Sequence, residues 1–389
     1  MSKINVRSFS NENEDGAPDL VGISTFSATS YFVPTRGTTE ERPSGHVEVG
    51  SLRYNYDTKT LEFYRGDTAG WASFELIDPE LGGGLTGGTG SNTGLGTRML
   101  AGGGDVDPSS YTNQIDFLTI STFGDSQEFG DLTRASTGAG GSASRTRGLF
   151  TNRRTFPSPV NSYFNEIDFV TIASTGDAQD FGDSTVTNGY NRALSSETRS
   201  LGLAFSSINT INYVTIASTG DAQDFGDQSG VLEGGAACAS STRGVLAGGG
   251  NIQRMDFITI ASTGDAKDFG DLSATVNNGI GLSNSTRGVF KIGFGSPLSY
   301  TNALEYITIT TLGNTIDFGD ALNVGPSAAS GASPTRGIFA GGSSPVSPYP
   351  RTNVIQKIEI LTTGNAVDFG DLSFAANHTA GFSNGHGGL

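Results

Sequence analysis

The chain has 389 residues, which is enough for two modest domains or for one large array of repeats. Its 57 Gly and 24 Phe, together with abundant Ser, Thr, Asn and Asp, favour short strands and tight turns, so we expect an all-β protein. A formal charge of −16 argues against nucleic acid as a partner, and the single Cys238 excludes an internal disulfide.

Residues 1–80 are expected to hold an extended arm and a small β-meander. Residues 1–30 are polar, lack the apolar core of a secretion signal, and should become ordered only in an assembly. Apolar residues alternate over 52–56 and 61–63 on either side of a turn, and Trp71 opens a third strand. So small a sheet has little core, and we expect it to be stable when packed in an oligomer or on a partner.

Residues 81–96 form a Gly-rich stretch that predicts a loosely packed linker and a domain boundary. No window of the chain approaches the roughly 18 consecutive apolar residues of a membrane span, so no membrane insertion is expected.

Residues 97–389 contain a repeat. The tripeptide Phe-Gly-Asp recurs with regular spacing at 129–131, 181–183, 225–227, 269–271, 318–320 and 369–371, in steps of 52, 44, 44, 49 and 51 residues. A Thr-Arg pair followed by apolar residues precedes each copy. The spacing is typical of a propeller blade of about 40–50 residues. Each unit should have four strands: a strand of small residues, the Arg-Gly strand, a strand such as Tyr306–Thr310, and the Phe-Gly-Asp strand.

The Phe-Gly-Asp tripeptide is expected to be structural. Phe should pack between neighbouring sheets, Gly should let two backbones approach, and Asp should bind loop amides or the recurrent Arg. The Ser-Thr-Gly-Asp before it supplies a turn for a hairpin.

The two ends of the repeat array complement each other. Residues 377–384 align with 277–284 as a first strand with no second strand after it, and residues 97–101 are a second strand without a convincing first. We therefore expect the C-terminal strand to complete the first sheet and close a six-bladed propeller over 97–389.

This repeat resembles the kelch type of β-propeller, although Phe-Gly-Asp stands where kelch repeats usually carry a Trp. Residues 34–43, 50–64 and Trp71 resemble a module of tail fibres and other virion proteins of tailed bacteriophages. Together the two parts are similar to virion structural proteins of marine cyanobacterial phages. The resemblance implies a virion protein without enzymatic activity, which docks on other virion proteins through residues 1–80 and forms a homo-oligomer in the particle.

No catalytic residue, cofactor or metal site is expected. His46, His378 and His386 fit no zinc or hydrolase motif, and a sialidase-like box around Asp180 has Ala178 where Ser is required. Asp105 and Asp107, with Asp177, Asp180 and Asp183, could offer oxygens to calcium, but no complete calcium loop is present and solvated turn carboxylates are the preferred interpretation.

Most of the length variation between repeats lies between the Arg-Gly strand and the strand after it. In a propeller these insertions share one face, which would bind a host-surface glycan or protein, or would reflect tolerated loop drift. The candidate binding residues on this face are Tyr111, Arg153, Arg154, Phe156, Tyr163, Tyr300 and Tyr349.

The function expected from these features is that of a tail fibre or similar appendage that adheres to the host surface through many weak contacts. Two alternatives stay open. One is a capsid-decorating or tail-cementing protein without receptor contact, and the other is a glycan-degrading enzyme.

Overall fold

The computed structural model describes residues 34–43, 47–58, 60–67, 70–73, 97–107, 110–155, 162–189, 192–203, 208–230, 234–250, 252–295, 299–324, 329–344 and 350–389. The expected arm, the expected linker and His46 lie outside these residues. The chain divides into two compact units, residues 1–76 and 77–389.

The first unit contains one four-stranded sheet. Its strands, in spatial order, are β1 (Thr35–Gly37), β2 (Leu52–Asn55), β3 (Thr60–Tyr64) and β4 (Trp71–Ser73). Strands β2, β3 and β4 form the expected antiparallel meander, and β1 adds to β2 in parallel.

The buried face of this sheet is polar. Glu62 and Asn55 are fully buried, Asn55 Nδ2 donates to Glu62 at 2.9 Å, and Arg42 pairs with the same carboxylate. Leu52 and Tyr56, on the other face, are each 45% exposed. The alternation was therefore predicted correctly, but the apolar side chains do not form the buried face, because residues 38–43 cover the polar one.

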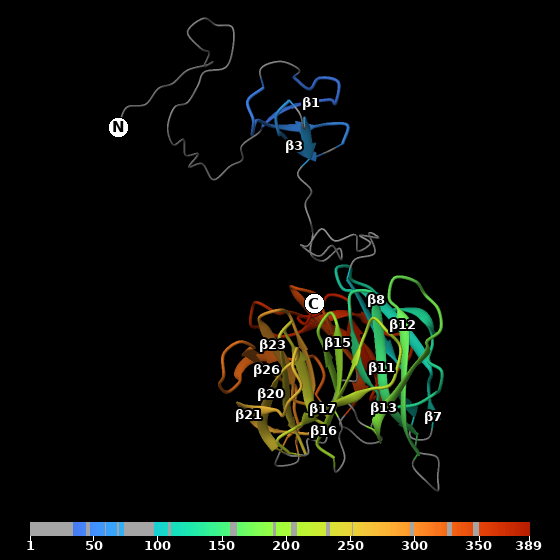
Figure 1. Cartoon of the computed structure of the whole chain (residues 1–389). Helices are drawn as coiled ribbons and strands as arrows, with labels where there is room; N and C mark the ends of the chain where they lie inside the picture. Colours follow the sequence, from blue (N-terminus) through green and yellow to red (C-terminus); the bar gives the residue numbers. More distant parts are fainter. Residues whose placement is uncertain are drawn as a thin grey trace, which may run out of the picture. The chain divides into compact units, whose positions relative to one another are not determined.

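The second unit is built from six four-stranded antiparallel sheets, counted among the described residues (Figure 1). We number them sheets 1 to 6 and give the strands from first to fourth. They are β32 (Ala380–Ser383), β5 (Arg98–Gly102), β8 (Gln114–Thr119) and β9 (Gln127–Asp131) in sheet 1; β10 (Gly140–Ala143), β11 (Arg147–Thr155), β12 (Ser162–Thr171) and β13 (Gln179–Asn188) in sheet 2; β14 (Arg192–Ser195), β15 (Arg199–Leu203), β16 (Thr210–Thr215) and β17 (Gln223–Asp227) in sheet 3; β18 (Ala236–Ala239), β19 (Arg243–Gly249), β20 (Ile252–Thr259) and β21 (Lys267–Val276) in sheet 4; β22 (Ile280–Ser283), β23 (Arg287–Lys291), β26 (Ala303–Thr308) and β27 (Ile316–Asp320) in sheet 5; β28 (Ala329–Ala332), β29 (Arg336–Ser343), β30 (Arg351–Glu359) and β31 (Val367–Asp371) in sheet 6.

Two short hairpins lie outside these sheets: β6 (Asp105–Asp107) with β7 (Ser110–Tyr111), and β24 (Phe294–Gly295) with β25 (Ser299–Tyr300). No helix occurs in the described part of the chain, so the all-β expectation is confirmed.

The C-terminal strand completes sheet 1. In β32, Phe382 pairs with Leu100 and Ser383 with Met99 in the antiparallel register with β5. The first strands also contact one another in sequence, β10 with β14, β14 with β18, β18 with β22, β22 with β28, β28 with β32, and β32 with β10. This arrangement is compatible with a β-propeller.

The strand registers define two ends of this unit. In sheet 2, Arg147 pairs with Thr171 and Ala143 with Gly148, so the turns 144–146 and 172–178 lie at the same end. We call this the turn end. The opposite end, where second strands connect to third strands and each sheet connects to the next, is the loop end.

The core lies between neighbouring sheets. For example, Leu149 and Phe181 of sheet 2 pack with Ile216 of sheet 3, and Phe369 of sheet 6 packs with Met99 of sheet 1. All six Phe residues of the Phe-Gly-Asp tripeptides are buried, as expected.

Each turn of the Ser-Thr-Gly-Asp type docks on the fourth strand of the preceding sheet. Gly176 N donates to Phe129 O at 2.8 Å, Ala178 N donates to Asp131 O at 2.7 Å, and Asp177 accepts from Asp131 N at 3.0 Å. A Cβ on Gly130 would come within 2.4 Å of Gly176 O, so only glycine permits this approach. We call this arrangement the clasp. The glycine pairs that form it are Gly130–Gly176, Gly182–Gly220, Gly226–Gly264, Gly270–Gly313, Gly319–Gly364 and Gly370–Gly124.

The recurrent Arg also joins neighbouring sheets. Arg243 stacks on Phe257 of its own sheet, with 4.5 Å from Cζ to the ring centroid, and donates to Ile309 O of the next sheet at 2.9 Å. The Asp of the tripeptide was expected to bind loop amides or the recurrent Arg. Arg243 instead binds a backbone carbonyl, and the carboxylate that bonds to the neighbouring sheet belongs to the turn, as Asp177 does with Asp131 N.

A buried acceptor in each third strand makes another link. Asp168 accepts from both the backbone and the hydroxyl of Thr133, and Asp116 accepts in the same way from Ser373. The equivalent acceptors are Asn212, Asp256, Glu305 and Gln356.

Candidate functional site

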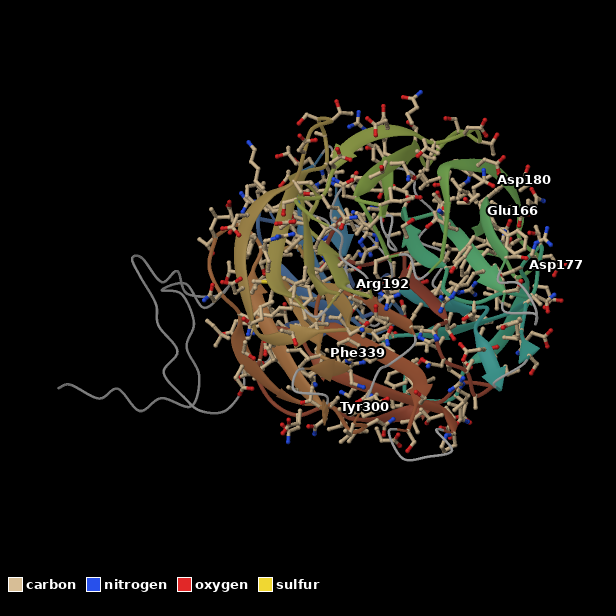
Figure 2. The ribbon with its side chains drawn as sticks, turned by 90° about the horizontal axis from the view of Figure 1, so that it is seen from below. Glu166, Asp177, Asp180, Arg192, Tyr300 and Phe339 are labelled. Carbon is tan, nitrogen blue, oxygen red and sulfur yellow. The ribbon has the colours of Figure 1, made fainter. Side chains whose placement is uncertain are left out.

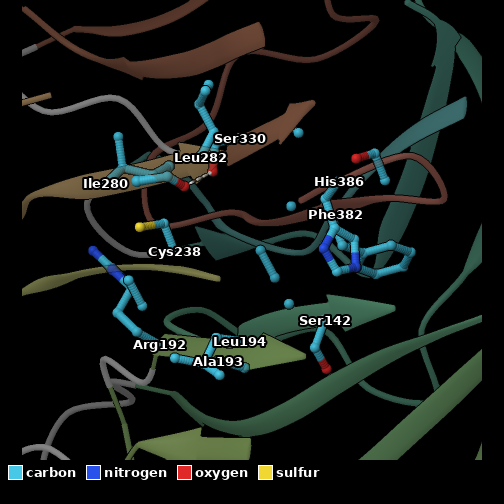
Figure 3. Close-up of a pocket in the computed structure, with 18 of the residues that line it drawn as sticks. Ser142, Arg192, Ala193, Leu194, Cys238, Ile280, Leu282, Ser330, Phe382 and His386 are labelled. Carbon is cyan, nitrogen blue, oxygen red and sulfur yellow. Dashed lines mark hydrogen bonds between the residues drawn. The ribbon is translucent and has the colours of Figure 1, made fainter. Parts of the chain in front are cut away.

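The first strands of all six sheets line a cavity of about 90 Å³, which we call the channel (Figure 3). Its walls are short side chains and glycines, with hydroxyls from Ser142, Ser195, Ser283, Ser330 and Ser383. Such a lining leaves room for a few water molecules and not for a sugar ring.

Residues after β32 fill the turn end of the channel. Gly387 N donates to Ser283 O of sheet 5 at 2.8 Å, and a Cβ on Gly388 would meet Ser195 O of sheet 3. His386 Nε2 donates to Ala143 O of sheet 2 at 2.8 Å, and its Nδ1 accepts from Gly388 N at 3.1 Å. Burial lowers the pKa of His386 to about 4, so the ring is neutral at pH 7.

Arg192 lies at the loop end of the channel. In the view of Figure 2 it is near the middle of the second unit. It opens β14, and its guanidinium donates to Gly235 O at 2.9 Å and to Gly279 O at 3.0 Å, which are carbonyls of the two following sheets. Burial lowers its pKa to about 10, so it keeps its charge at neutral pH.

A polar cluster centred on Asp105 lies close to Arg192. The Asp105 carboxylate accepts from Thr137 Oγ1 at 3.0 Å and from His378 Nδ1 at 3.0 Å, and it pairs with Arg351. Burial raises the pKa of Asp105, but the His378 hydrogen bond and the charges of His378 and Arg351 outweigh this effect, so the pKa lies below its ordinary value. These partners occupy both oxygens of Asp105, one of the carboxylates that the sequence offered as a calcium ligand.

His378 links this cluster to the channel. Burial is the largest cause of its lowered pKa, and the charges of Arg154 and Arg192 lower it further, whereas Asp105 opposes the shift. The neighbouring Thr379 lines the channel. Arg192 is the Arg that lines the channel, while Arg351 pairs with Asp105 and Arg154 interacts with the Asp105 charge.

Three of the expected binding residues come together at this cluster. Arg154 in β11 is buried, its pKa is lowered to about 9 by burial, and it interacts with the hydroxyl groups of Tyr163 and Tyr111. Tyr163 in β12 is 41% exposed, while Tyr111 in β7 is half-buried.

Arg153 does not lie on the loop surface. It is 1% exposed and pairs with Asp168 at 2.6 Å and with Glu166 at 3.5 Å. A β-bulge between Thr151 and Arg153 in the pairing of β11 with β12 accompanies two consecutive buried Arg side chains. Arg153 therefore contributes to the junction between sheets and not to a binding surface.

Tyr300 in β25 is 38% exposed and lies nearer the edge of the second unit than Arg192 does in the view of Figure 2. Phe156 and Tyr349 lie outside the described residues.

The sequence did not predict that Arg192, Asp105, His378 and Arg351 lie close together. One signal was present: the residue that opens each first strand is Gly140, Ala236, Ile280, Ala329 or Ala380 in the other sheets, and a large cation at this position in sheet 3 is exceptional.

Cys238 and Lys291 are buried nucleophiles, and Cys238 lies in the wall of the channel. Cys238 packs on Gly288, and burial raises the pKa of its thiol. Lys291 is 1% exposed, and burial lowers its pKa to about 7. Among the residues that the structure describes, no group of three His, Cys, Asp or Glu side chains could hold a metal ion.

A scan against protein-family models gave no match, and a search of curated proteins found no similar sequence. The described residues contain no helix that is long and apolar enough to cross a membrane.

Proposed function

We propose that the chain is a virion structural protein of a tailed bacteriophage, a tail fibre or similar appendage, that adheres to the host surface and catalyses no reaction. In this proposal residues 97–389 form a six-bladed kelch-like propeller closed by β32, and residues 1–80 dock on other virion proteins. The protein then resides in the virion as a homo-oligomer.

Two structural features support the propeller. The first strands contact one another in an unbroken cycle, and the clasp recurs at every junction, including the one between sheet 6 and sheet 1. A rigid ring of this kind holds its loop-end side chains in fixed positions, which lowers the entropic cost of binding.

The single observation that carries the adhesion proposal is the composition of the loop end. The half-exposed rings of Tyr163 and Tyr300 lie at this end, and buried Arg154 interacts with Tyr163. Arg192 and Arg351 bring further positive charge to the same end of a protein whose net charge is −16. Aromatic and Arg side chains are enriched where protein surfaces recognise ligands.

The exposed face of the sheet in the first unit supports the docking role of residues 1–80. Leu52 and Tyr56 leave apolar surface uncovered on a sheet whose buried face is already polar. A partner that covers this surface would supply the core that the small sheet lacks.

Adsorption of the purified chain to host cells tests the proposal. The double variant Tyr163→Ala and Tyr300→Ala should bind labelled host cells at least fivefold more weakly than the wild type, while circular dichroism shows that it keeps the β-sheet fold. The control variant Thr219→Ala and Thr263→Ala alters exposed residues at the turn end and should bind like the wild type. Equal binding by all three proteins would contradict adhesion through the loop end.

A further inference from the structure

The repeat provides an internal comparison at the turn end, because equivalent positions occur in all six sheets. The residue directly before the turn glycine is Thr175, Thr219 and Thr263 in sheets 2 to 4 and Leu312 in sheet 5. The residue two before the Phe of the tripeptide is Gln179, Gln223 and Lys267 in sheets 2 to 4, but Ile316 in sheet 5 and Val367 in sheet 6.

A third position follows the same rule. An Ile directly follows each of these third strands, at 172, 216, 260 and 360. The residue after this Ile is Ala173, Ala217 and Ala261 in sheets 2 to 4, and Leu361 in sheet 6. The four apolar side chains are prominently exposed: Leu312 is 60%, Ile316 58%, Leu361 58% and Val367 48% exposed. We call them the apolar arc.

The clasp joins the two hairpins that carry the arc. Leu312 and Ile316 belong to one hairpin, and Leu361 and Val367 belong to the next. The turn of the second hairpin docks on β27, the strand that carries Ile316, through Gly364 N to Phe318 O at 2.8 Å. The arc therefore spans two adjacent sheets, and Phe123 of sheet 1, 60% exposed, extends it beyond Val367.

Folding does not explain the arc. Sheets 2, 3 and 4 form the same hairpins and the same clasps with Thr, Gln, Lys and Ala at these positions. An exposed apolar side chain costs solubility, and a contiguous group of them is typical of an interaction site.

The charges around the arc indicate its partner. Exposed carboxylates border it on both sheets, from Asp317 and Asp320 in β27, Asp368 and Asp371 in β31, and Glu359 in β30. Three cations of the chain lie beside the arc. Lys357 lies 4.8 Å over the Phe123 ring and pairs with Glu359, Arg336 pairs with the same carboxylate, and Arg287 donates to Ile360 O. The four Asp carboxylates are left for a partner to pair with. A second copy of this chain would bring the same carboxylates together, which costs free energy, whereas basic side chains would pair with them.

We infer that the apolar arc is a docking surface for a protein strip of apolar side chains bordered by Lys or Arg. Because the arc is at the turn end, a partner bound there leaves the loop end accessible. This inference does not depend on what the loop end binds.

The probe is a fluorescently labelled peptide of alternating Leu and Lys, and its control is a peptide of alternating Leu and Glu. Fluorescence anisotropy measures the affinity of each peptide for the full chain. The wild type should bind the Leu-Lys peptide at least tenfold more tightly than the Leu-Glu peptide, and affinity should fall as salt is raised. The variant L312T, I316Q, L361A and V367Q uses the residues that fold in sheets 2 to 4, so it should keep the wild-type melting temperature and lose at least tenfold in affinity.

The matched control variant carries T219A, Q223A, T263A and Q179A at equivalent positions on the polar sheets, and it should bind like the wild type. An unchanged affinity of the arc variant, or an equal loss in the control variant, would overturn the inference. Sedimentation is the second measurement. If the wild type is a dimer and only the arc variant is a monomer, the arc binds a second copy of the chain, and the inference of a basic partner is overturned.

Discussion

Asp371 and Asp125, separated by 246 residues, are joined by a hydrogen bond from the backbone N–H of Asp371 to the Asp125 carboxylate at 3.0 Å. The same bond with the same length joins Asp131 to Asp177 and Asp227 to Asp265. The junction between sheet 6 and sheet 1 is therefore built from the same contacts as the junctions between sheets that are consecutive in the chain. This explains why the hairpin sequence is repeated so closely: each copy must fit the copy before it.

Gly370→Ala should destabilise the second unit more than Gly364→Ala does. Both glycines have a φ of +156°, so the backbone strain of a side chain is equal at the two sites. A Cβ on Gly370 would come within 2.4 Å of Gly124 O, whereas a Cβ on Gly364 meets nothing within 4 Å. We expect Gly370→Ala to lose about 1–3 kcal/mol more in urea unfolding. Equal losses in the free energy of unfolding would show that the close approach of the two glycines in the clasp does not contribute to stability.

Arg243→Ala should lower the free energy of unfolding by about 2 kcal/mol, because it removes both the hydrogen bond to Ile309 O and the stacking on Phe257. Arg145→Ala is the control, since its pair with Glu197 at 3.4 Å is half-exposed and should contribute less than about 1 kcal/mol. Thermal unfolding of the two variants checks the difference. A loss at Arg145 as large as that at Arg243 would contradict the role of the Arg as a link between sheets.

Phe123 compensates for a missing aromatic residue in sheet 6. In five sheets an aromatic ring packs edge-on to the Phe of the tripeptide, as Tyr306 does to Phe318. Sheet 6 has Lys357 at that position, and there Phe123 from the next turn stacks on Phe369 at 5.2 Å instead. Phe123→Thr should therefore lose about 1 kcal/mol, and adding Lys357→Phe should restore most of it.

A double-mutant cycle measured by urea unfolding tests this compensation. Additive effects of Phe123→Thr and Lys357→Phe would contradict it. Gln127→Ala, in the exposed part of β9, provides a control for changes at the turn end and should leave the free energy of unfolding within about 0.5 kcal/mol.

The sequence predicted much of this fold because its signal is local and repeated. The alternation in residues such as Tyr306–Thr310 predicted the third strands, and the match of 377–384 to 277–284 predicted that β32 pairs with β5. The partner of each turn could not be predicted in this way. The Ser-Thr-Gly-Asp sequence predicted a turn, and only three-dimensional packing shows that the Asp177 carboxylate binds the preceding sheet.

The candidate site was less predictable than the fold. Tyr163 and Arg154 were expected to share a surface, and their interaction is present. Arg153, one residue away, is buried on Asp168, because the bulge at 151–153 breaks the alternation on which the expectation depended. Arg192, Asp105 and His378 are far apart in sequence, and no local pattern brings them together.

His386 should make the stability of the second unit depend on pH. Its pKa is about 4 in the folded state, mainly because of burial, against about 6.5 in the unfolded chain. Its Nδ1 already accepts from Gly388 N, so a proton there would break that bond. The unfolded state therefore binds more protons between these two values, and the stabilisation is present above pH 6.5 and is lost as the pH falls toward 4.

The expected loss reaches about 3 kcal/mol at pH 4, from 1.36 kcal/mol for each pH unit. His386→Gln removes this titration while keeping a donor that can bind Ala143 O. The wild type should be more stable than His386→Gln at pH 7, and the difference should shrink as the pH is lowered from 6.5 to 4 in urea unfolding. The titration of His378 affects both proteins equally, so its contribution cancels in the comparison. If the difference in the free energy of unfolding stays constant over this range, His386 is not held neutral in the channel.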